Sequence, residues 1–251
     1  MRTRLRQLAL GALVLPLALG VAACGKKDDA AAPTSGEPIA KIAPPAGKAW
    51  ADTVVKTAEG GYRMGNPDAP IKLIEYGALS CSHCAEFAKE SFGKLRDDYI
   101  ASGRVSYELR YFMLNPYDIP ASLLATCGAT EAVIPLSEQF WVWQPNMFQN
   151  MQTAGDAKLA AIDALPKERQ IGAIADTAGM TEFFASRGIA RDQAQACLAD
   201  TARARALAEQ TQTATDKYNV TGTPTFLING SVVGSMGWPE LQAKLQQAGA
   251  R

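Results

Sequence analysis

Residues 71–84, IKLIEYGALSCSHC, decide the fold. The first six residues are rich in types that favour strands, so they predict a β-strand. Two cysteines with two residues between them follow. Ser80 and Ser82 beside them suit the N-terminal cap of a helix, which we expect from about Cys84 to Ile100. A strand, a Cys-x-x-C pair and a helix thus follow in direct succession.

The rest of the chain predicts an α/β sheet with a helical block inside it. Alternating apolar residues predict a strand over 104–113. Ala, Gln, Glu and Leu dominate from 117 to about 218, which indicates several helices. Residues 225–233, TFLINGSVV, place Asn-Gly between apolar runs and predict a hairpin, and residues 239–247 suit a closing helix. We therefore predict an α/β fold with an all-helical subdomain inserted at about 117–206.

The N-terminus has the pattern of an export sequence. Three arginines in the first six residues precede a short apolar run, and small residues then precede Cys24. This pattern predicts a signal peptide over 1–23, with an uncleaved membrane anchor as the alternative. Residues 21–24, VAAC, resemble a bacterial lipobox, so we expect lipid attachment at Cys24. Residues 24–50 have few large apolar residues and predict a flexible tether.

Export favours disulfides, because compartments outside the cytosol are oxidising. Apart from Cys24, the chain has Cys81, Cys84, Cys127 and Cys197, and four cysteines allow three pairings. Sequence proximity favours Cys81 with Cys84, which leaves Cys127 with Cys197. The net charge is zero, so no electrostatic argument supports a nucleic-acid partner.

The residues 81–84, CSHC, suit thiol–disulfide exchange. Cys81 is expected at a helix N-terminus, where free backbone N–H groups favour a thiolate, and a protonated His83 would add positive charge. A lowered thiol pKa makes Cys81 a good leaving group and the disulfide more oxidising. A substrate thiolate would attack the Cys81 sulfur and release Cys84. This chemistry requires no dissociable cofactor.

Other uses of these residues stay open. A Cys-x-x-C pair is also half of many zinc sites, but zinc usually needs four ligands and the one histidine, His83, lies inside the motif. We therefore expect no metal. A purely structural disulfide between Cys81 and Cys84 is a further alternative. The aromatic and Met-rich residues 141–151 could line a substrate groove, although core packing of the helical block is favoured.

Together these residues resemble the thioredoxin superfamily, and within it the DsbA-like proteins with a helical insertion. The resemblance rests on the Cys-x-x-C pair, on Glu75 six residues before it, and on residues 222–226, GTPTF. It implies that Pro224 is cis and packs against the active-site disulfide. It implies that Thr223 offers its backbone to substrate, and that Glu75 is a buried acid serving the second cysteine. The resemblance covers residues 51–251.

The resemblance implies a thiol–disulfide oxidoreductase of the periplasm or cell envelope, held to a membrane by lipid. Its partners would be unfolded or partly folded exported proteins with thiols, together with a membrane redox partner. Some relatives carry a second disulfide, which favours a structural Cys127–Cys197 bond over two buried thiols. Thr223 is typical of isomerases, and Ser82 departs from the strongest oxidases. The short tether has no room for a dimerisation domain, which favours a monomeric oxidase.

Two further readings come from other functional classes. A copper- or haem-assembly chaperone could use the same dithiol, and a lipoprotein could use the fold for binding alone. Extra Met or His ligands beside the motif would favour the chaperone, but Met236 after the predicted hairpin is the nearest candidate. Retained dithiol exchange after Cys81→Ser would favour the binding lipoprotein.

Overall fold

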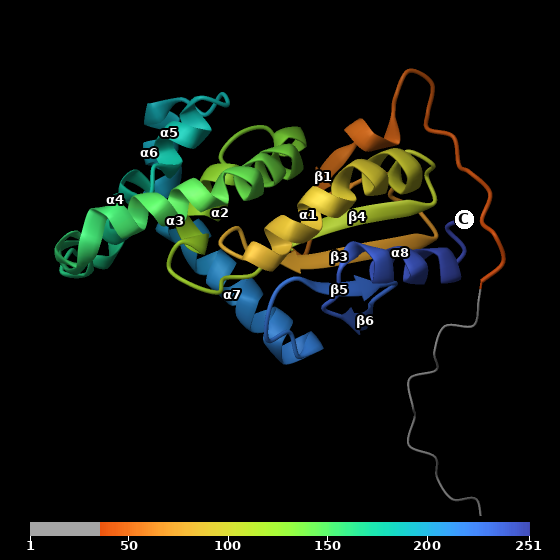
Figure 1. Ribbon diagram of the computed structural model, residues 1–251. Helices are drawn as coiled ribbons and strands as arrows, with labels where there is room; N and C mark the ends of the chain where they lie inside the picture. Colours follow the sequence, from red (N-terminus) through yellow and green to blue (C-terminus); the bar gives the residue numbers. More distant parts are fainter. Residues whose placement is uncertain (1–35) are drawn as a thin grey trace, which may run out of the picture. The chain divides into compact units, whose positions relative to one another are not determined.

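A six-stranded mixed sheet forms the centre of the protein in the computed structural model, which describes residues 36–251 (Figure 1). Its strand order is β1-β2-β4-β3-β5-β6, and only the central β3–β4 pair is parallel. The strands are β1 Val54–Lys56, β2 Tyr62–Met64, β3 Ile71–Gly77, β4 Val105–Tyr111, β5 Thr225–Ile228 and β6 Ser231–Gly234.

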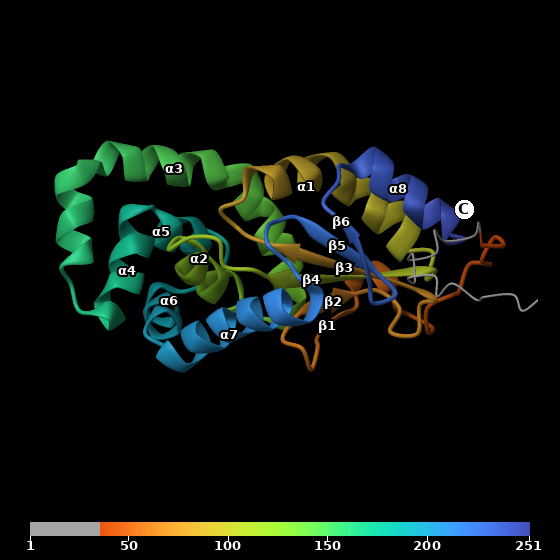
Figure 2. The same ribbon diagram turned by 90° about the horizontal axis from the view of Figure 1, so that it is seen from below.

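Eight α-helices accompany the sheet in this part of the chain. Six of them, α2 to α7, come between β4 and β5, so the expected helical block is present and extends to the end of α7. The α-helices are α1 Ser82–Lys94, α2 Asp118–Ala125, α3 Val133–Asp163, α4 Lys167–Thr177, α5 Met180–Ala185, α6 Arg191–Leu198, α7 Thr201–Tyr218 and α8 Trp238–Gln247. Figure 2 shows α1, α8 and the start of α3 on one side of the sheet and α7 on the other.

Short helices of other kinds complete the fold. Two 3-10 helices, η1 Trp50–Asp52 and η3 Thr130–Ala132, precede β1 and α3, and a π-helix, η2 Leu95–Ile100, extends α1. The expected helix over 84–100 is therefore an α-helix that widens into a π-helix. No helix within residues 36–251 combines the length and the apolar character needed to cross a membrane.

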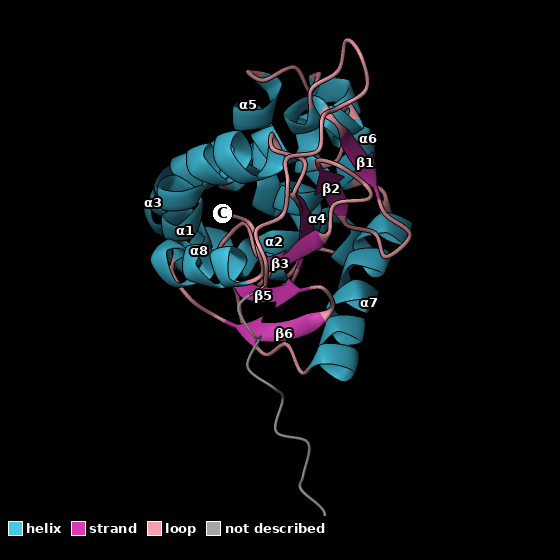
Figure 3. Ribbon diagram, turned by 90° about the vertical axis from the view of Figure 1, so that its right-hand side faces the viewer, coloured by secondary structure: helices cyan, strands magenta, loops and turns pink. Residues whose placement is uncertain are grey.

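The central strand β3 is buried on both faces, as its apolar sequence requires. Alternation along the strand sends Leu73 and Glu75 to the α1 side, and Ile74 and Tyr76 to the α7 side. The α1 side contributes to the main apolar core, whereas a smaller cluster with Val220 lies on the α7 side. Figure 3 shows the helices on both sides of the strands. Glu75 therefore occupies a position in the main core.

The N-terminal residues divide into two parts. The predicted signal peptide over 1–23 and Cys24 lie outside the described residues. Residues 36–49 of the expected tether form no helix or strand, yet they bond to the folded part. The Gly36 N–H donates to the Gln247 carbonyl oxygen at 2.6 Å, and the Ile39 N–H donates to the Gly249 carbonyl oxygen at 2.9 Å. This stretch therefore lies against the C-terminal end of α8.

Candidate active site

The sheet register brings two distant loops together. Strand β3 ends at Gly77, and the antiparallel strand β5 begins at Thr225, which pairs with Tyr76. The segment after β3 and the segment before β5 therefore meet at the same end of the sheet. The Cys81 sulfur lies 3.3 Å from the Thr223 carbonyl oxygen, and the Thr223–Pro224 peptide is cis.

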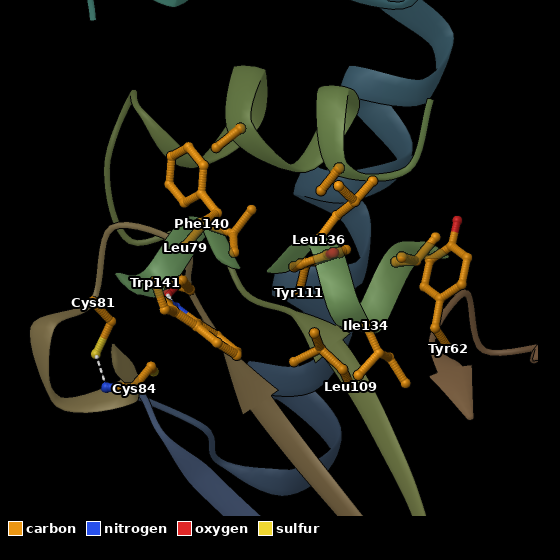
Figure 4. Packing of buried hydrophobic residues seen from close by; sticks show 14 of the residues in the cluster. Tyr62, Leu79, Cys81, Cys84, Leu109, Tyr111, Ile134, Leu136, Phe140 and Trp141 are labelled. Atoms are coloured by element: carbon orange, nitrogen blue, oxygen red, sulfur yellow. Dashed lines mark hydrogen bonds between the residues drawn. The ribbon is translucent and has the colours of Figure 1, made fainter. Parts of the chain in front are cut away.

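The sulfur of Cys81 caps helix α1. It accepts a hydrogen bond from the Cys84 N–H at 3.2 Å, and Cys81 is the N-cap residue (Figure 4). The expectation that Ser80 or Ser82 would cap the helix is therefore wrong. Ser80 bonds elsewhere, because its N–H and hydroxyl both donate to the carboxylate of Asp118, at 2.8 and 2.9 Å. The reactive sulfur thus occupies the position where a helix N-terminus stabilises negative charge best.

The two thiols have opposite acidities. A hydrogen bond with Cys84, reinforced by the backbone at the helix start, lowers the pKa of Cys81 to about 6. Cys84 is fully buried, and this burial raises the pKa of its thiol well above the usual value, with the nearby Glu75 acting in the same direction. Cys81 is therefore largely a thiolate at neutral pH, while Cys84 holds its proton.

Glu75 lies near Cys84 and is 1% exposed. The Tyr107 hydroxyl donates to its Oε2 at 2.8 Å, whereas its Oε1 is buried and has no hydrogen-bond partner in the described part of the chain. Burial raises the pKa of Glu75 to about 8, although the bond from Tyr107 opposes this shift. Glu75 can therefore gain or lose a proton near neutral pH beside Cys84.

The raised pKa of Glu75 makes the free energy of unfolding depend on pH. The folded state, with a Glu75 pKa of about 8, binds its proton more tightly than the unfolded state, where the pKa is about 4.5. Stability is therefore lost as the pH rises from about 4.5 through 8. We expect Glu75→Gln to raise the free energy of unfolding at pH 7 by about 1–3 kcal/mol, with little effect at pH 4.

Urea unfolding of the wild type and the variant between pH 4 and pH 9 measures this difference. Glu90→Gln is the matched control, because Glu90 is an exposed glutamate on α1. An unchanged pH slope in Glu75→Gln would contradict the prediction.

His83 is exposed to solvent. Its side chain is 80% exposed, and its Nδ1 lies 3.8 Å from a carboxylate oxygen of Glu86. A pocket of about 340 Å³ opens beside it, between the start of α1, the cis proline and the segment after β6. The side chains that line this pocket include those of His83, Glu86, Phe87, Glu90, Pro224 and Met236.

Three residues that no sequence motif marks, namely Asp118, Trp141 and Gln144, hold the loop before the cysteines. Besides Ser80, the Asp118 carboxylate accepts the N–H groups of Leu114 and Asn115, each at 3.0 Å. From α3, the Trp141 ring N–H donates to the Ala78 carbonyl oxygen at 2.9 Å, and the Gln144 amide donates to the Leu79 carbonyl oxygen at 2.6 Å. Trp141 is thus a buried core residue that also positions the cysteine loop.

The other two cysteines are bonded to each other. Cys127 follows α2 and Cys197 lies in α6, and their sulfurs are joined at 2.05 Å. Arg203 supports the bond, because its guanidinium lies 3.9 Å from the Cys197 sulfur and donates to the Thr126 carbonyl oxygen at 3.0 Å. This disulfide ties together two helices of the inserted block.

The sheet, the helix N-terminal Cys-x-x-C pair and the adjacent cis proline define the class of thioredoxin-like dithiol proteins. A family model described as Thioredoxin matches residues 57–247. The chain belongs to this family, and its resemblance to the DsbA-like members with a helical insertion is confirmed.

Individual relatives agree with this assignment. A crystal structure of a protein-disulfide isomerase from Novosphingobium aromaticivorans is 30% identical, with a TM-score of 0.70 over 75% of this chain and 99% of that one. Wolbachia pipientis alpha-DsbA1 shares the fold at 21% identity, with a TM-score of 0.58 over 74% of this chain and 89% of that one. A putative protein-disulfide oxidoreductase from Rickettsia bellii is 23% identical over 77% of this chain. The chain spans 66% and 59% of the lengths of the first two curated relatives.

Proposed function

We propose that this protein is a thiol–disulfide oxidoreductase of the cell envelope that introduces disulfides into exported proteins. The observation that carries the proposal is the unequal pair of thiols, with an acidic Cys81 at a helix N-terminus and a buried, protonated Cys84. The names of the relatives from Novosphingobium and Rickettsia support the same chemistry. Cys81 and Cys84 are the proposed catalytic residues.

The proposed reaction starts from a Cys81–Cys84 disulfide. A substrate thiolate attacks the Cys81 sulfur, the bond to Cys84 breaks, and the Cys84 sulfur leaves with the electron pair. Because the pKa of Cys84 is raised, this sulfur takes up a proton, and Glu75 is the nearby acid that can supply it. A second substrate thiolate then attacks the substrate sulfur of the mixed disulfide. Cys81 leaves as a stabilised thiolate, and the substrate leaves oxidised.

Thr223 and Pro224 have the proposed role of holding the substrate. The Thr223 backbone lies beside Cys81, and the pocket next to Pro224 and His83 can accept side chains of an extended polypeptide. Backbone pairing is indifferent to sequence, which suits a protein that acts on many unfolded chains. His83 is exposed beside this pocket, so its proposed contribution as a catalytic residue is contact with the incoming chain.

Lipid attachment at Cys24 and the signal peptide over 1–23 remain part of the proposal and rest on the sequence alone. Mass spectrometry of the protein extracted from membranes tests them, since a mature chain that starts at an acylated Cys24 is expected. We also propose a monomer, with a membrane redox partner that reoxidises Cys81 and Cys84.

The reduction potential tests the proposed direction. A stabilised Cys81 thiolate stabilises the reduced form, so we expect a potential more oxidising than about −200 mV, toward the strong-oxidant end of the scale near −120 mV. Equilibration of a purified fragment that spans residues 36–251 with glutathione buffers measures this value. Insulin reduction and refolding of a scrambled disulfide protein are run on the same sample. A value near −270 mV with active insulin reduction would show a reductase.

Isomerase activity is the second candidate. Two observations favour it, namely Thr223 before the cis proline and the Novosphingobium relative, which is described as an isomerase. Recovery of a scrambled protein without added oxidant would identify this direction.

A further inference from the structure

A second acid, the half-buried Glu138, lies near Glu75 on the first half of α3. This turn of α3 is fixed to the sheet side, because the Ser137 and Tyr111 hydroxyls share a hydrogen bond of 2.6 Å and Trp141 bonds to Ala78. Glu138 follows Ser137 directly. Its Oε1 is buried and has no hydrogen-bond partner within residues 36–251. A buried polar atom without a partner is costly, and such atoms often mark a functional demand.

The free oxygen of Glu75 faces the same helix. A Cβ atom placed on Gly77 would lie 3.1 Å from Glu75 Oε1 and 3.4 Å from the Trp141 ring, so this oxygen lies near Trp141. Residues three apart on a helix are neighbours on its surface, which puts Glu138 next to Trp141 on α3. Glu75 and Glu138 therefore lie near each other, and each has one buried oxygen without a partner in the described part of the chain.

The charged neighbours of Glu138 are the buried Glu75 and the partly exposed Arg96. Burial raises the pKa of Glu138 to about 9, nearby Arg96 opposes this shift, and Glu75 adds to it. Tyr107 of β4 donates a hydrogen bond to Glu75, and both Glu138 and Cys84 contribute to the raised pKa of its hydroxyl. Arg96 of η2 is 46% exposed and pairs with Asp97 at 2.8 Å. The charge of Asp52 in η1 also contributes to the raised pKa of Arg96.

We propose that Glu138 is the outer proton carrier of this site, exchanging protons between solvent near Arg96 and Glu75, which exchanges them with Cys84. Glu138 touches neither substrate nor sulfur, so it is a positioning residue for the proton and acts through Glu75. The inference rests on the proposed dithiol function and adds to it a route by which a sealed thiol equilibrates with water.

The proton balance defines when this route is used. When Cys84 closes the disulfide, its S–H proton passes to the Glu75 carboxylate. The Cys84 sulfur bonds to the Cys81 sulfur, and the group held on Cys81 leaves as a thiolate. Glu75 then returns to the carboxylate by passing a proton to Glu138, and Glu138 releases one to solvent. In the opposite direction, when Cys84 leaves as a thiolate, the protons move inward through the same groups.

Ellman's reagent, 5,5′-dithiobis(2-nitrobenzoate), separates the two steps on the reduced protein. Attack by Cys81 releases the first nitrothiobenzoate, and attack by Cys84 on the resulting mixed disulfide releases the second. The second release is intramolecular, so its rate does not depend on reagent concentration. We expect Glu138→Gln to slow the second release about tenfold at pH 8–9, where the carboxylate forms of Glu75 and Glu138 are populated, and to leave the first unchanged. In this variant the rate of the second release should also lose the pH dependence that comes from titration of Glu138 near pH 9.

Two further variants make the test specific. Asp156→Asn removes an exposed acid from the same helix and should leave both releases unchanged. Glu138→Asp keeps a carboxyl group and should recover most of the rate. Because carriers in series act as a unit, Glu75→Gln combined with Glu138→Gln should be no slower than Glu75→Gln alone.

The outcomes separate the relay from the dithiol function. Loss of the first release in the wild type would overturn the proposed function itself. A normal first release with an unchanged second release in Glu138→Gln would overturn the relay alone, as would additive slowing in the double variant. If the amide lowers the melting temperature, Glu138→Leu replaces it, because leucine leaves no buried polar group. The same slow second release is then required.

Discussion

Cys81→Ser is expected to lower the rate of dithiol exchange by at least about 10³-fold, because it removes the proposed nucleophile. A serine hydroxyl at the same helix N-terminus stays protonated and forms no disulfide. Turnover in the insulin and scrambled-protein assays measures the loss. Cys84→Ser should behave differently, since Cys81 remains reactive but cannot be released by its neighbour. Mixed disulfides with substrate should then accumulate and appear on non-reducing gels.

The control for this experiment keeps the reactive pair and removes the other cysteines. Cys127→Ser with Cys197→Ser should retain exchange, because their disulfide ties helices of the inserted block and does not include Cys81 or Cys84. Exchange at the wild-type rate in Cys81→Ser would rule out the dithiol mechanism. It would favour a lipoprotein that uses the fold for binding alone.

The second large effect is expected from the Cys127–Cys197 bond. The two residues are 70 positions apart, so the cross-link restricts a long segment of the unfolded chain. Loop-closure entropy for this length corresponds to about 4 kcal/mol of stability. We expect Cys127→Ser with Cys197→Ser to lower the free energy of unfolding by about that amount. Guanidinium unfolding monitored by far-UV circular dichroism measures the change.

A chemical control separates the bond from the packing of its residues. The wild type treated with dithiothreitol and then alkylated should lose a similar amount of stability. Cys81→Ser with Cys84→Ser, treated in the same way, removes any contribution from the reactive pair. A loss below about 1 kcal/mol in the variant without the bond would contradict the entropic argument, and would place most of the stability in the helix contacts.

The sequence predicts the central part of the fold because the residues there follow regular patterns. Strand β3, the Asn-Gly hairpin and the helix α8 lie within about one residue of the predicted ranges. The strands β1 and β2 were not predicted, since each has three residues and three residues cannot display an alternation. Helix α3 continues through Pro145, a residue type that commonly interrupts helices, but it is kinked at Gly155, where the backbone angles are non-helical.

The candidate site was predictable where chemistry is local and unpredictable where it depends on distant contacts. The cysteine pair, Thr223 and Pro224 can be found from short motifs. Asp118 and Glu138 cannot, because each looks like an ordinary acidic residue of a helical segment. Their roles arise from contacts with residues that are far away in the sequence. The cap provided by the Cys81 sulfur was also missed, since serine is the commoner cap and two serines are adjacent.

The environment of Cys81 is complete only after Thr223 has been synthesised. The two residues are 142 positions apart, and strand β5 follows the whole helical block. During synthesis Cys81 is therefore made long before the loop that contains Thr223 exists. An immature chain lacks the Thr223 contact and the pocket beside Pro224, so its thiols are closer to ordinary cysteines. Selective labelling of Cys81 by a thiolate-specific reagent at mildly acidic pH should consequently report chain completion, and a truncation before β5 should label slowly.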